Sequence, residues 1–464
     1  MTRVHIIGAG LAGSEAAWQC ARRGVPVDLF EMRPVRTTPA HQTADFAELV
    51  CSNSLKSDSE YTAPWLLKEE MHRAGSLLLK IARERSVPAG HALAVDRTEF
   101  SREVTETISR EPLIHIRREE AAHVDAGQIT IIATGPLTSD ALAEEIVRLS
   151  APTDGLSDNP SQPSAPRHSH QLFFYDSISP IVEADSIDMS KVYFAARYDK
   201  GSADYINCPM SKDDYDKFYD ALLSAQSVEE KDWEKLNYFE SCLPIEEIAR
   251  RGRDTLRFGP MKPVGLKDPR TGRIPYAAVQ LRQENLRADS YNLVGFQNHL
   301  KFGEQANVLR FIPGLENARF LRYGQIHRNT YINSPALLTP TLQMKSHPRL
   351  LFAGQICGVE GYVESIATGL LAGINAAALA TDNEPVPPPR ASAFGSLIHY
   401  ITQADPRNFQ PANITFDLLP ALETHVRDRK ERHRLQCQAA LNIFQEWWIQ
   451  ASPTPVVSAT LSND

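Results

Sequence analysis

Cysteine is scarce in this sequence, with six residues among 464, and no two of them form a C-x-x-C pair or a spacing typical of a metal site. A disulfide framework or a zinc centre is therefore not expected. The chain also lacks an uninterrupted apolar run of about 18 residues, which argues against a membrane-spanning helix. Its N-terminal segment is a short apolar run entering a glycine-rich turn rather than a secretory signal, so a cytoplasmic location is expected.

What the sequence does contain is typical of a soluble globular protein, with 42% hydrophobic and 23% charged residues. Its length predicts about two to three domains. The net charge of −8 counts against a nucleic-acid partner unless basic residues cluster locally. Such a cluster exists between residues 249 and 287, where ten Lys or Arg residues face three acidic ones.

The first 31 residues read as a strand, a glycine turn, a helix and a second strand. Gly8, Gly10 and Gly13 form a G-x-G-x-x-G motif between the first strand and the helix, and Leu11 and Ala12 complete the turn. Glycine at these places lets a pyrophosphate approach the helix N-terminus closely. Glu31 lies 18 residues after Gly13, at the end of the second strand, where it could accept hydrogen bonds from an adenosine ribose. The motif predicts a dinucleotide site that fits FAD or NAD.

A late segment decides between these two cofactors. Residues 349–380 again read as strand, glycine-rich turn and a long helix of small residues, with Gly354 and Gly361 in the turn. This segment resembles the second flavin motif of glutathione-reductase-like flavoproteins, in which a helix N-terminus faces the isoalloxazine ring. No second G-x-G-x-x-G follows a strand, so a dedicated NAD(P)H domain is not expected.

We predict an α/β fold: a glutathione-reductase-like, Rossmann-type FAD-binding domain with an inserted smaller α+β domain. The FAD-binding domain is expected over residues 1–190 and 315–464, with C-terminal helices and a tail. The insertion is expected over 191–314, where the sequence becomes aromatic, basic and rich in proline. One helix is predicted from Thr62 to Glu84, a surface loop over 150–169, and the active site in the cleft between the domains.

Several longer strings together are similar to one family, Gid/TrmFO, the folate- and FAD-dependent tRNA uracil-5-methyltransferases. These strings are ELVCSNSLKSD (48–58), YFESCLPIEEIARRGRDTLRFGPMKPVGL (238–266), VQLRQEN (279–285), YNLVGFQNHLKFGEQ (291–305), IPGLENARFLRYGQIHRNTYINSP (312–335) and FAGQICGVEGYVES (352–365). The resemblance implies methylation of C5 of uridine 54 in the T-loop of tRNA. It implies 5,10-methylenetetrahydrofolate as carbon donor, reduced FAD as methylene carrier and reductant, and NADH or NADPH as the source of electrons. It implies no membrane and no protein partner.

The resemblance also implies catalytic residues. Cys51 and Cys242 match the family's functional cysteines, and Tyr362 lies at the start of the flavin helix. C5 of uracil becomes nucleophilic once a thiolate adds to C6, so a reactive cysteine suits this chemistry. Which cysteine attacks and which assists stays open, although Cys242 leads directly into the basic stretch.

Further residues are candidates for substrate binding. His327 and His299 compete for the role of stacking on the pterin ring, and Arg328 follows His327 in the same string. Arg257, Lys262 and Arg282 belong to the basic stretch and suit RNA phosphates.

Three other functions fit parts of this pattern. A ribosomal-RNA uracil methyltransferase or a GidA-like wobble-uridine modifier would share the fold, although GidA relatives are longer than this chain. A flavin-binding RNA chaperone without catalysis would not need the two cysteines. Flavin turnover with NAD(P)H would distinguish an enzyme from such a chaperone.

Overall fold

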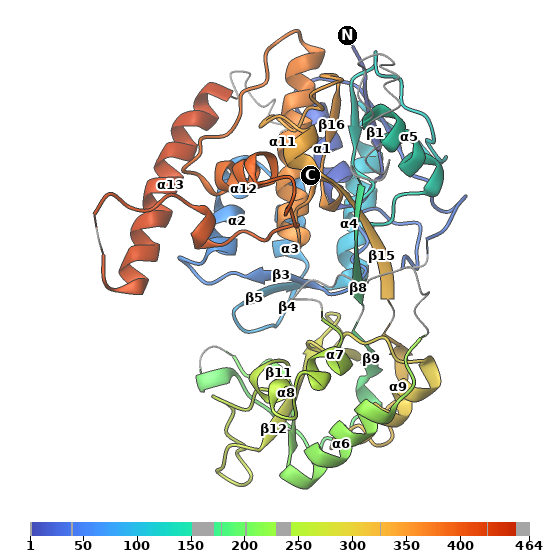
Figure 1. The fold of residues 1–464 in the computed structure, drawn as a ribbon, viewed down its shortest axis with the longest axis vertical. Coiled ribbons are helices and arrows are strands. Elements are labelled where there is room, and N and C mark those ends of the chain that lie inside the picture. The colour runs from blue at the N-terminus through green and yellow to red at the C-terminus, as the bar shows by residue number, and fades with distance from the viewer. Residues whose placement is uncertain are drawn as a thin grey trace, which may run out of the picture.

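The computed structural model of the chain describes residues 2–38, 40–150, 171–177, 179–199, 202–228, 243–324, 326–424 and 426–451. Figure 1 shows two parts, one above the other, with the N-terminal and C-terminal thirds of the sequence both in the upper part and the middle of the sequence in the lower part. Each part has its own hydrophobic core. The lower core draws on residues from Val182 to Ala318, and the upper core on residues before and after that range.

The upper part is built on a five-stranded parallel sheet, in the order β16-β7-β1-β2-β6. Its strands are β1 (Val4–Ile7), β2 (Val27–Phe30), β6 (Ile114–Arg117), β7 (Thr130–Ile132) and β16 (Leu350–Phe352). The first and last thirds of the chain thus supply neighbouring strands. A parallel sheet needs helical crossovers, which agrees with the strand-helix-strand pattern at both ends of the sequence.

Two helices cross the sheet side by side because small residues line their contact. These helices are α1 (Leu11–Ala21) and α11 (Tyr362–Ala380). A Cβ atom added at Gly369 would lie 2.3 Å from the Ala12 carbonyl oxygen, and one at Gly373 would lie 2.6 Å from that of Ala16. Any larger residue at these glycines would push the helices apart. The two glycine-rich turns are therefore held next to each other.

The helix predicted from Thr62 to Glu84 is two helices, so that prediction was wrong. α2 (Ala63–Arg73) begins at a Thr62 cap, and α3 (Leu77–Glu84) begins at a Ser76 cap. Gly75 between them has φ of +75°, in the left-handed region that ends a helix. The apolar periodicity continues across this break, which is why the sequence pattern did not reveal it.

The rest of the upper part surrounds this centre. A three-stranded sheet, β3-β5-β4, lies at its lower edge (Figure 1). The remaining elements are β3 (Ser54–Ser57), β4 (Ser86–Val87), β5 (Ala92–Val95), α4 (Arg97–Arg110), α5 (Asp140–Ser150), α10 (Ser334–Leu337), α12 (Ala393–Gln403) and α13 (Arg429–Ala451).

The lower part is built on a six-stranded sheet in the order β10-β11-β12-β13-β9-β14, in which all paired strands are antiparallel. Its elements are β9 (Ile181–Glu183), β10 (Tyr193–Phe194), β11 (Tyr205–Met210), α6 (Lys212–Ser224), α7 (Ile245–Arg250), α8 (Thr255–Phe258), β12 (Ala277–Gln283), β13 (Ser290–Leu293), α9 (Phe302–Leu309) and β14 (Phe320–Arg322). Strands β8 (Gln171–Ser177) and β15 (Ile326–Ile332) pair with each other and run between the two parts (Figure 1). The predicted loop over 150–169 lies, apart from Ser150, outside the described residues.

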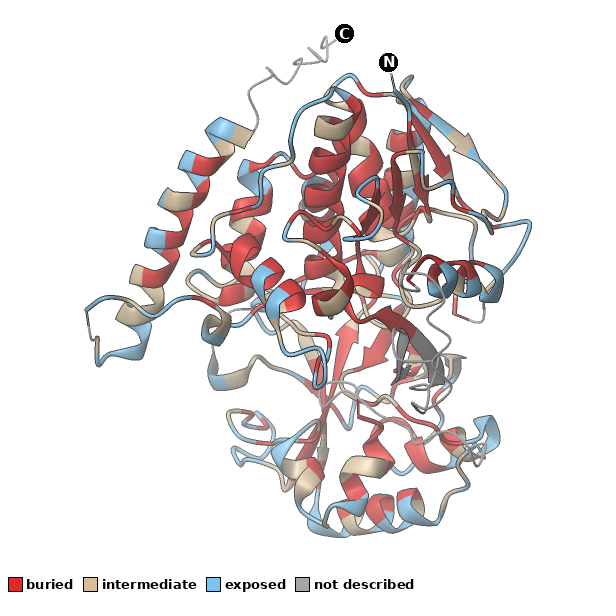
Figure 2. Cartoon of the chain, turned by 45° about the horizontal axis from the view of Figure 1, so that its top comes forward, coloured by how far each residue is buried: buried red, intermediate tan, exposed pale blue. Residues whose placement is uncertain are grey.

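Among the described residues, α11 is long and apolar enough to cross a membrane. It is instead the central helix of the upper core, because 83% of its apolar window is buried inside the protein. Figure 2 shows this helix almost entirely in the colour of buried residues.

Candidate active site

The glycines of the first glycine-rich turn have two different roles, one structural and one in binding. Gly8 has φ of +98°, and a Cβ atom at Gly13 would lie 1.7 Å from the Gly8 carbonyl oxygen, so both glycines are required by the fold itself. Gly10 is different, because no protein atom lies within 4 Å of its Cβ position. The N-terminus of α1, where Leu11 and Ala12 begin the helix, is therefore open to a phosphate group at Gly10. These residues fit the pyrophosphate of a dinucleotide.

A pocket lies beside this turn, at the carboxyl ends of β1, β2 and β7. Its lining includes Gly8, Gly10, Glu31, Arg33, His41 and Thr134. In open parallel sheets, ligands bind at this edge. The pocket position agrees with a nucleotide site built on the G-x-G-x-x-G motif.

Glu31 lines this pocket, but protein donors occupy both of its oxygens. Oε1 accepts from the Arg33 backbone N–H at 3.1 Å and from Arg33 Nε at 2.9 Å. Oε2 accepts from the Ala9 N–H at 3.1 Å and from Arg33 Nη2 at 3.2 Å. Burial acts to raise the pKa of Glu31, but these hydrogen bonds and the Arg33 charge outweigh it and hold the pKa below its ordinary value. A ribose hydroxyl would share an oxygen that also binds Arg33 or Ala9.

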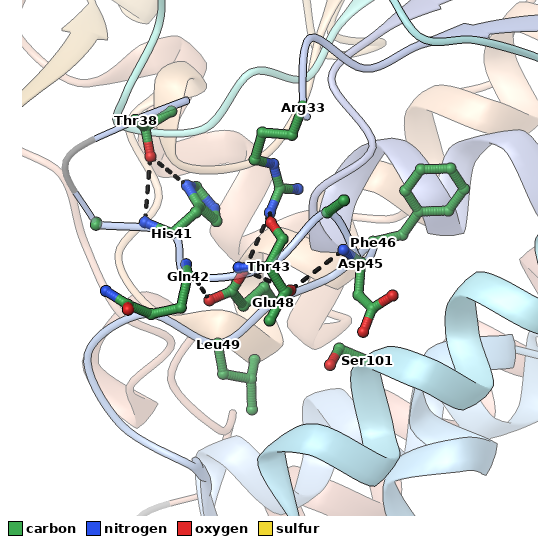
Figure 3. Close-up of polar contacts among 12 residues, drawn as sticks. Arg33, Thr38, His41, Gln42, Thr43, Asp45, Phe46, Glu48, Leu49 and Ser101 are labelled. Atoms are coloured by element: carbon green, nitrogen blue, oxygen red, sulfur yellow. Dashed lines mark hydrogen bonds and ion pairs between the residues drawn. The ribbon is translucent and has the colours of Figure 1, made fainter. Parts of the chain in front are cut away.

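Figure 3 shows the segment that follows β2 and leads toward Cys51. Glu48 organises it: Oε1 accepts the Gln42 N–H at 2.8 Å, and Oε2 accepts the Thr43 N–H and Arg33 Nη1, each at 3.1 Å. Arg33 therefore bridges Glu31 in the pocket and Glu48 in this segment. The arrangement ties the nucleotide pocket to the chain just before the predicted catalytic cysteine.

His41 belongs to the same segment and is expected to make the fold sensitive to acid. Its Nδ1 lies 2.6 Å from Thr38 Oγ1, and burial together with the Arg33 charge lowers the pKa of His41 from 6.5 to about 4. The folded state prefers neutral His41, whereas the unfolded chain takes up a proton near pH 6.5. Stability should therefore fall as the pH drops from 6.5 toward 4. Thermal melting of wild type and His41→Gln at pH 7.5 and pH 5 should show a smaller acid loss in the variant, and equal losses would contradict the assignment.

The Cys51 thiol is held by Tyr362, the first residue of α11. The Tyr362 hydroxyl oxygen accepts the N–H of Cys51 at 2.9 Å and that of Ser52 at 3.2 Å, and it lies 3.0 Å from Cys51 Sγ. With both acceptor positions used by backbone donors, the hydroxyl proton points to the sulfur. Burial raises the pKa of Tyr362 well above its ordinary value, so it keeps this proton. A hydrogen bond donated to sulfur favours its charged form.

Two guanidinium groups add positive charge here. Arg97 and Arg322 both interact electrostatically with Cys51 and Tyr362. Arg97 also donates to the Leu49 carbonyl oxygen at 2.6 Å, and Arg322 donates to that of Ala40 at 3.0 Å. Burial and repulsion from Arg97 lower the pKa of Arg322. Positive charge beside a cysteine stabilises its thiolate.

A second contact holds the Cys51 segment against α11. Lys56 Nζ donates to Glu364 Oε1 at 2.6 Å and to Asn413 Oδ1 at 2.5 Å. Gly361 leaves room for this pair, because its Cβ position lies 2.5 Å from Glu364 Oε2 and 2.6 Å from Lys56 Nζ. Gly354 has a similar packing role, since its Cβ position lies 2.9 Å from Ala12 Cβ.

The lower part of the molecule holds the Cys51 segment from the other side. Arg282 on β12 donates from Nε to Asn53 Oδ1 at 2.9 Å and from Nη2 to Ser52 Oγ at 2.8 Å. Asn53 is fully buried and donates to the Gln283 carbonyl oxygen at 2.9 Å. Glu284 binds Arg97, with oxygen to nitrogen distances of 3.0 and 3.2 Å. The Cys51 segment is therefore fixed between the two parts.

This placement changes the interpretation of the basic stretch. Arg282, predicted to bind phosphate, is 8% exposed and used in the contacts above, so it does not belong to an exposed basic surface. Arg257 pairs with Asp254 at 2.8 Å and stacks on Tyr276 at 3.7 Å. Lys262 is exposed. Three exposed cations of the stretch make no ion pair within the described part of the chain: Lys262, Lys267 and Arg273.

The two predicted stacking histidines are placed differently. His299 is 8% exposed, its backbone N–H donates to Glu246 Oε1 at 2.7 Å, and burial lowers its pKa. His327 and Arg328 lie in β15, paired with Asp176 and Tyr175 of β8, and only their backbone is described. Cys242 lies outside the described residues, immediately before Leu243.

Sequence reasoning missed several residues of this site: Arg97, Arg322, Lys56, Glu364 and Asn53. Lys56 and Asn53 stand in the same string as Cys51, so their proximity to the cysteine was a usable signal. Arg97 and Arg322 had no such signal, because only the fold brings them to Cys51.

Comparisons with known proteins show what this chain is similar to. A family model described as "Glucose inhibited division protein A" matches residues 3–384. The chain is 69% identical over 450 residues to the "Methylenetetrahydrofolate--tRNA-(uracil-5-)-methyltransferase TrmFO" of Koribacter versatilis, covering 96% of this chain and 98% of the relative. It is 62% identical over 453 residues to the protein of the same name from Solibacter usitatus, with the same two coverages.

A solved structure of Aquifex aeolicus GidA superimposes with a TM-score of 0.70 at 16% identity. The match covers 98% of this chain and 74% of that one. This likeness confirms the predicted α/β fold class with a Rossmann-type parallel sheet.

Proposed function

Because this chain is a member of the Gid/TrmFO family, we propose that it methylates C5 of uridine 54 in the T-loop of tRNA, with 5,10-methylenetetrahydrofolate as carbon donor and FAD as cofactor. The observation that carries the proposal is the Cys51 sulfur, which accepts a hydrogen bond from the Tyr362 hydroxyl at the start of α11 and interacts with two guanidinium groups. A site of this kind favours a thiolate at Cys51, which suits either attack on uracil or assistance to an attack by Cys242.

The first set of residues would bind the cofactor. The N-terminus of α1 at Gly10 and the pocket beside Glu31 would hold the FAD pyrophosphate and adenosine. When bound, reduced FAD supplies the carrier for the one-carbon unit and the electrons that complete the methyl group. We also propose NADH or NADPH as the source of those electrons, and a cytoplasmic location.

The protein's own contribution to the reaction is a cysteine thiolate. Addition of a cysteine thiolate to C6 of uracil gives C5 the electron density to form a new carbon–carbon bond. Loss of the C5 proton and release of the new carbon from its carrier follow, and the thiolate leaves C6 once that carbon has been reduced to a methyl group. Cys51 and Cys242 are the candidates for this attack and for its assistance, and Tyr362 would hold the Cys51 sulfur in place.

The direct test is an assay with purified protein, a tRNA transcript, methylenetetrahydrofolate and NADPH or NADH. We expect 5-methyluridine at position 54 and a flavin absorbance in the purified protein. Methylation that proceeds from S-adenosylmethionine without folate would overturn the proposal. Modification mapped to ribosomal RNA or to the wobble position would favour the same-fold alternatives.

The exposed cations of the basic stretch are expected to bind the tRNA backbone. Changing Lys262, Lys267 and Arg273 together to Glu replaces three positive charges, which make no ion pair among the described residues, with negative ones. Each phosphate contact contributes about 0.7 to 0.9 to the slope of log affinity against log salt. The triple variant should therefore bind tRNA more weakly and lose about 2 from that slope, as measured by binding at several salt concentrations.

Arg282→Gln provides the matched contrast within the same stretch. Because Arg282 holds Ser52 and Asn53, this variant should lower kcat and leave the tRNA Kd and its salt slope unchanged. If Arg282→Gln instead reduces the salt slope, as the triple variant is expected to do, then Arg282 contacts phosphate and the positioning role proposed for it is wrong.

A further inference from the structure

Three aromatic rings form a stack that the proposed chemistry does not use. Tyr323 is the middle ring, 5.4 Å from Phe320 at an interplanar angle of 25°, and 5.7 Å from Phe302 at 32°. Phe320 packs against the lower core, whereas Phe302, the first residue of α9, is 58% exposed. The stack therefore begins in the protein interior and ends in solvent.

The stack is held in place from two sides. β14, which contains Phe320, pairs with β9 through Val182. Gln305 on α9 exchanges two hydrogen bonds with Gly324, each 2.8 Å or shorter, so the helix that carries Phe302 is tied to the residue after Tyr323. A fixed platform loses little conformational entropy when a ligand binds.

The segments that carry the stack also interact with Cys51 and with the start of α7. Arg322, directly before Tyr323, interacts electrostatically with Cys51. On the other side, Lys301 directly precedes Phe302, and the neighbouring His299 carbonyl accepts the Val228 N–H at 2.9 Å. The Ile245 N–H donates to the Gln297 carbonyl oxygen at 2.8 Å, which places the chain just after Cys242 beside the same loop.

We propose that the exposed face of Phe302 is a stacking platform for an unpaired base of the RNA substrate. This inference rests on the proposed function, because it assumes that the partner is RNA. Every nucleobase presents an aromatic face, and stacking on a protein ring binds it without reading its sequence. Lys301, the residue before Phe302, is exposed, and its ammonium donates to the neutral Gln226 Oε1 at 3.1 Å, so its charge can complement the phosphate that follows such a base. A solvent-exposed phenylalanine directly next to an exposed lysine fits this partner better than a purely apolar one.

The test replaces Phe302 with Ala, Leu and Trp in the full-length flavoprotein. Affinity is measured with a tRNA transcript, and stacking with a T-loop 2-aminopurine whose fluorescence falls when the base stacks. Phe302→Ala and Phe302→Leu should each weaken tRNA binding by about tenfold and abolish the quenching, and Phe302→Trp should restore both. Leucine keeps the apolar area without the π face, so it separates stacking from hydrophobic contact.

Phe311→Ala is the matched control, because Phe311 is also exposed, at 46%, lies just beyond α9 and makes no ring contact among the described residues. It should bind tRNA as the wild type does. Unchanged tRNA affinity and unchanged fluorescence quenching in Phe302→Ala would refute the stacking role of Phe302 and leave the proposed function intact. A higher KM for methylenetetrahydrofolate with unchanged tRNA affinity would assign the ring to the pterin and equally reject an RNA base. Failure of the wild type to bind tRNA would instead refute the proposed function.

Discussion

Cys51→Ala should abolish methyl transfer to tRNA, with a loss on the order of 10³-fold or more, while the FAD content stays unchanged. Removing a covalent nucleophile or its direct partner costs this much because no other side chain replaces the thiolate. The variant removes the sulfur that accepts the Tyr362 hydrogen bond, and leaves the backbone N–H of residue 51 to bind Tyr362 as before. Initial rates of 5-methyluridine formation measure the effect.

Buried cysteines supply the controls for this prediction. Cys20 and Cys437 are fully buried, and burial raises the pKa of each thiol to about 12, so neither offers a thiolate at neutral pH. Cys20→Ala and Cys437→Ala should therefore keep full activity once folded. If Cys51→Ala methylates at the rate of these controls, the site built around Tyr362 is not the catalytic one.

A fluorinated substrate identifies the attacking cysteine. A tRNA with 5-fluorouridine at position 54 cannot lose a proton from C5, so the covalent complex should accumulate and migrate as a shifted band in a denaturing gel. Of Cys51→Ala and Cys242→Ala, the variant that loses this band has lost the nucleophile. We expect it to be Cys242→Ala, with Cys51 assisting. A shifted band together with normal methylation in both single variants would refute the covalent mechanism proposed for these cysteines.

Gly13→Ala should prevent the protein from folding correctly, which is the largest structural effect expected in the chain. The added methyl carbon would lie 1.7 Å from the Gly8 carbonyl oxygen and 3.4 Å from Ala133 Cβ. Neither the backbone oxygen of the turn nor the buried β7 end can move without separating α1 from the sheet. Soluble yield and thermal melting should both collapse relative to the wild type.

Gly10→Ala is the matched variant in the same motif, with the opposite expectation for folding. Gly10 has φ of −71°, which any residue adopts, and no protein atom lies within 4 Å of its Cβ position. This variant should fold like the wild type and lose FAD, because its methyl group stands where a pyrophosphate approaches the helix. Flavin absorbance per protein measures the loss. A Gly10→Ala protein that retains stoichiometric FAD would place the cofactor elsewhere.

The sequence predicted the sheet and the two glycine-rich turns well because these features are local. A strand followed by G-x-G-x-x-G and a helix has a strong periodicity and a specific steric need at Gly8 and Gly13. The break at Gly75 was missed because a left-handed glycine does not interrupt apolar spacing. The domain bounds at 191 and 314 stay predictions, although Val182 and Leu315 already belong to the lower core.

The candidate site was only partly accessible from the sequence. Cys51 and Tyr362 could each be singled out from their own strings, but their contact joins residues 311 positions apart. Arg282 was assigned to phosphate because a count of basic residues does not distinguish a buried guanidinium from an exposed one. The roles of Cys242, His327 and Arg328 stay predictions, because their side chains lie outside the described residues.

The buried polar contacts between the two parts have a mechanical consequence. Moving the two parts of the molecule away from each other would break the Arg282–Asn53 hydrogen bond and the Arg97–Glu284 ion pair, both of which are largely buried. The two parts should therefore keep a fixed arrangement when the substrate binds, rather than close around it. The strain of bringing a uracil to the thiol then falls on the nucleic acid, which must swing the base out of its loop. Substrates whose loop is already loosened should be modified fastest, so selection among RNAs would depend on how easily each one deforms.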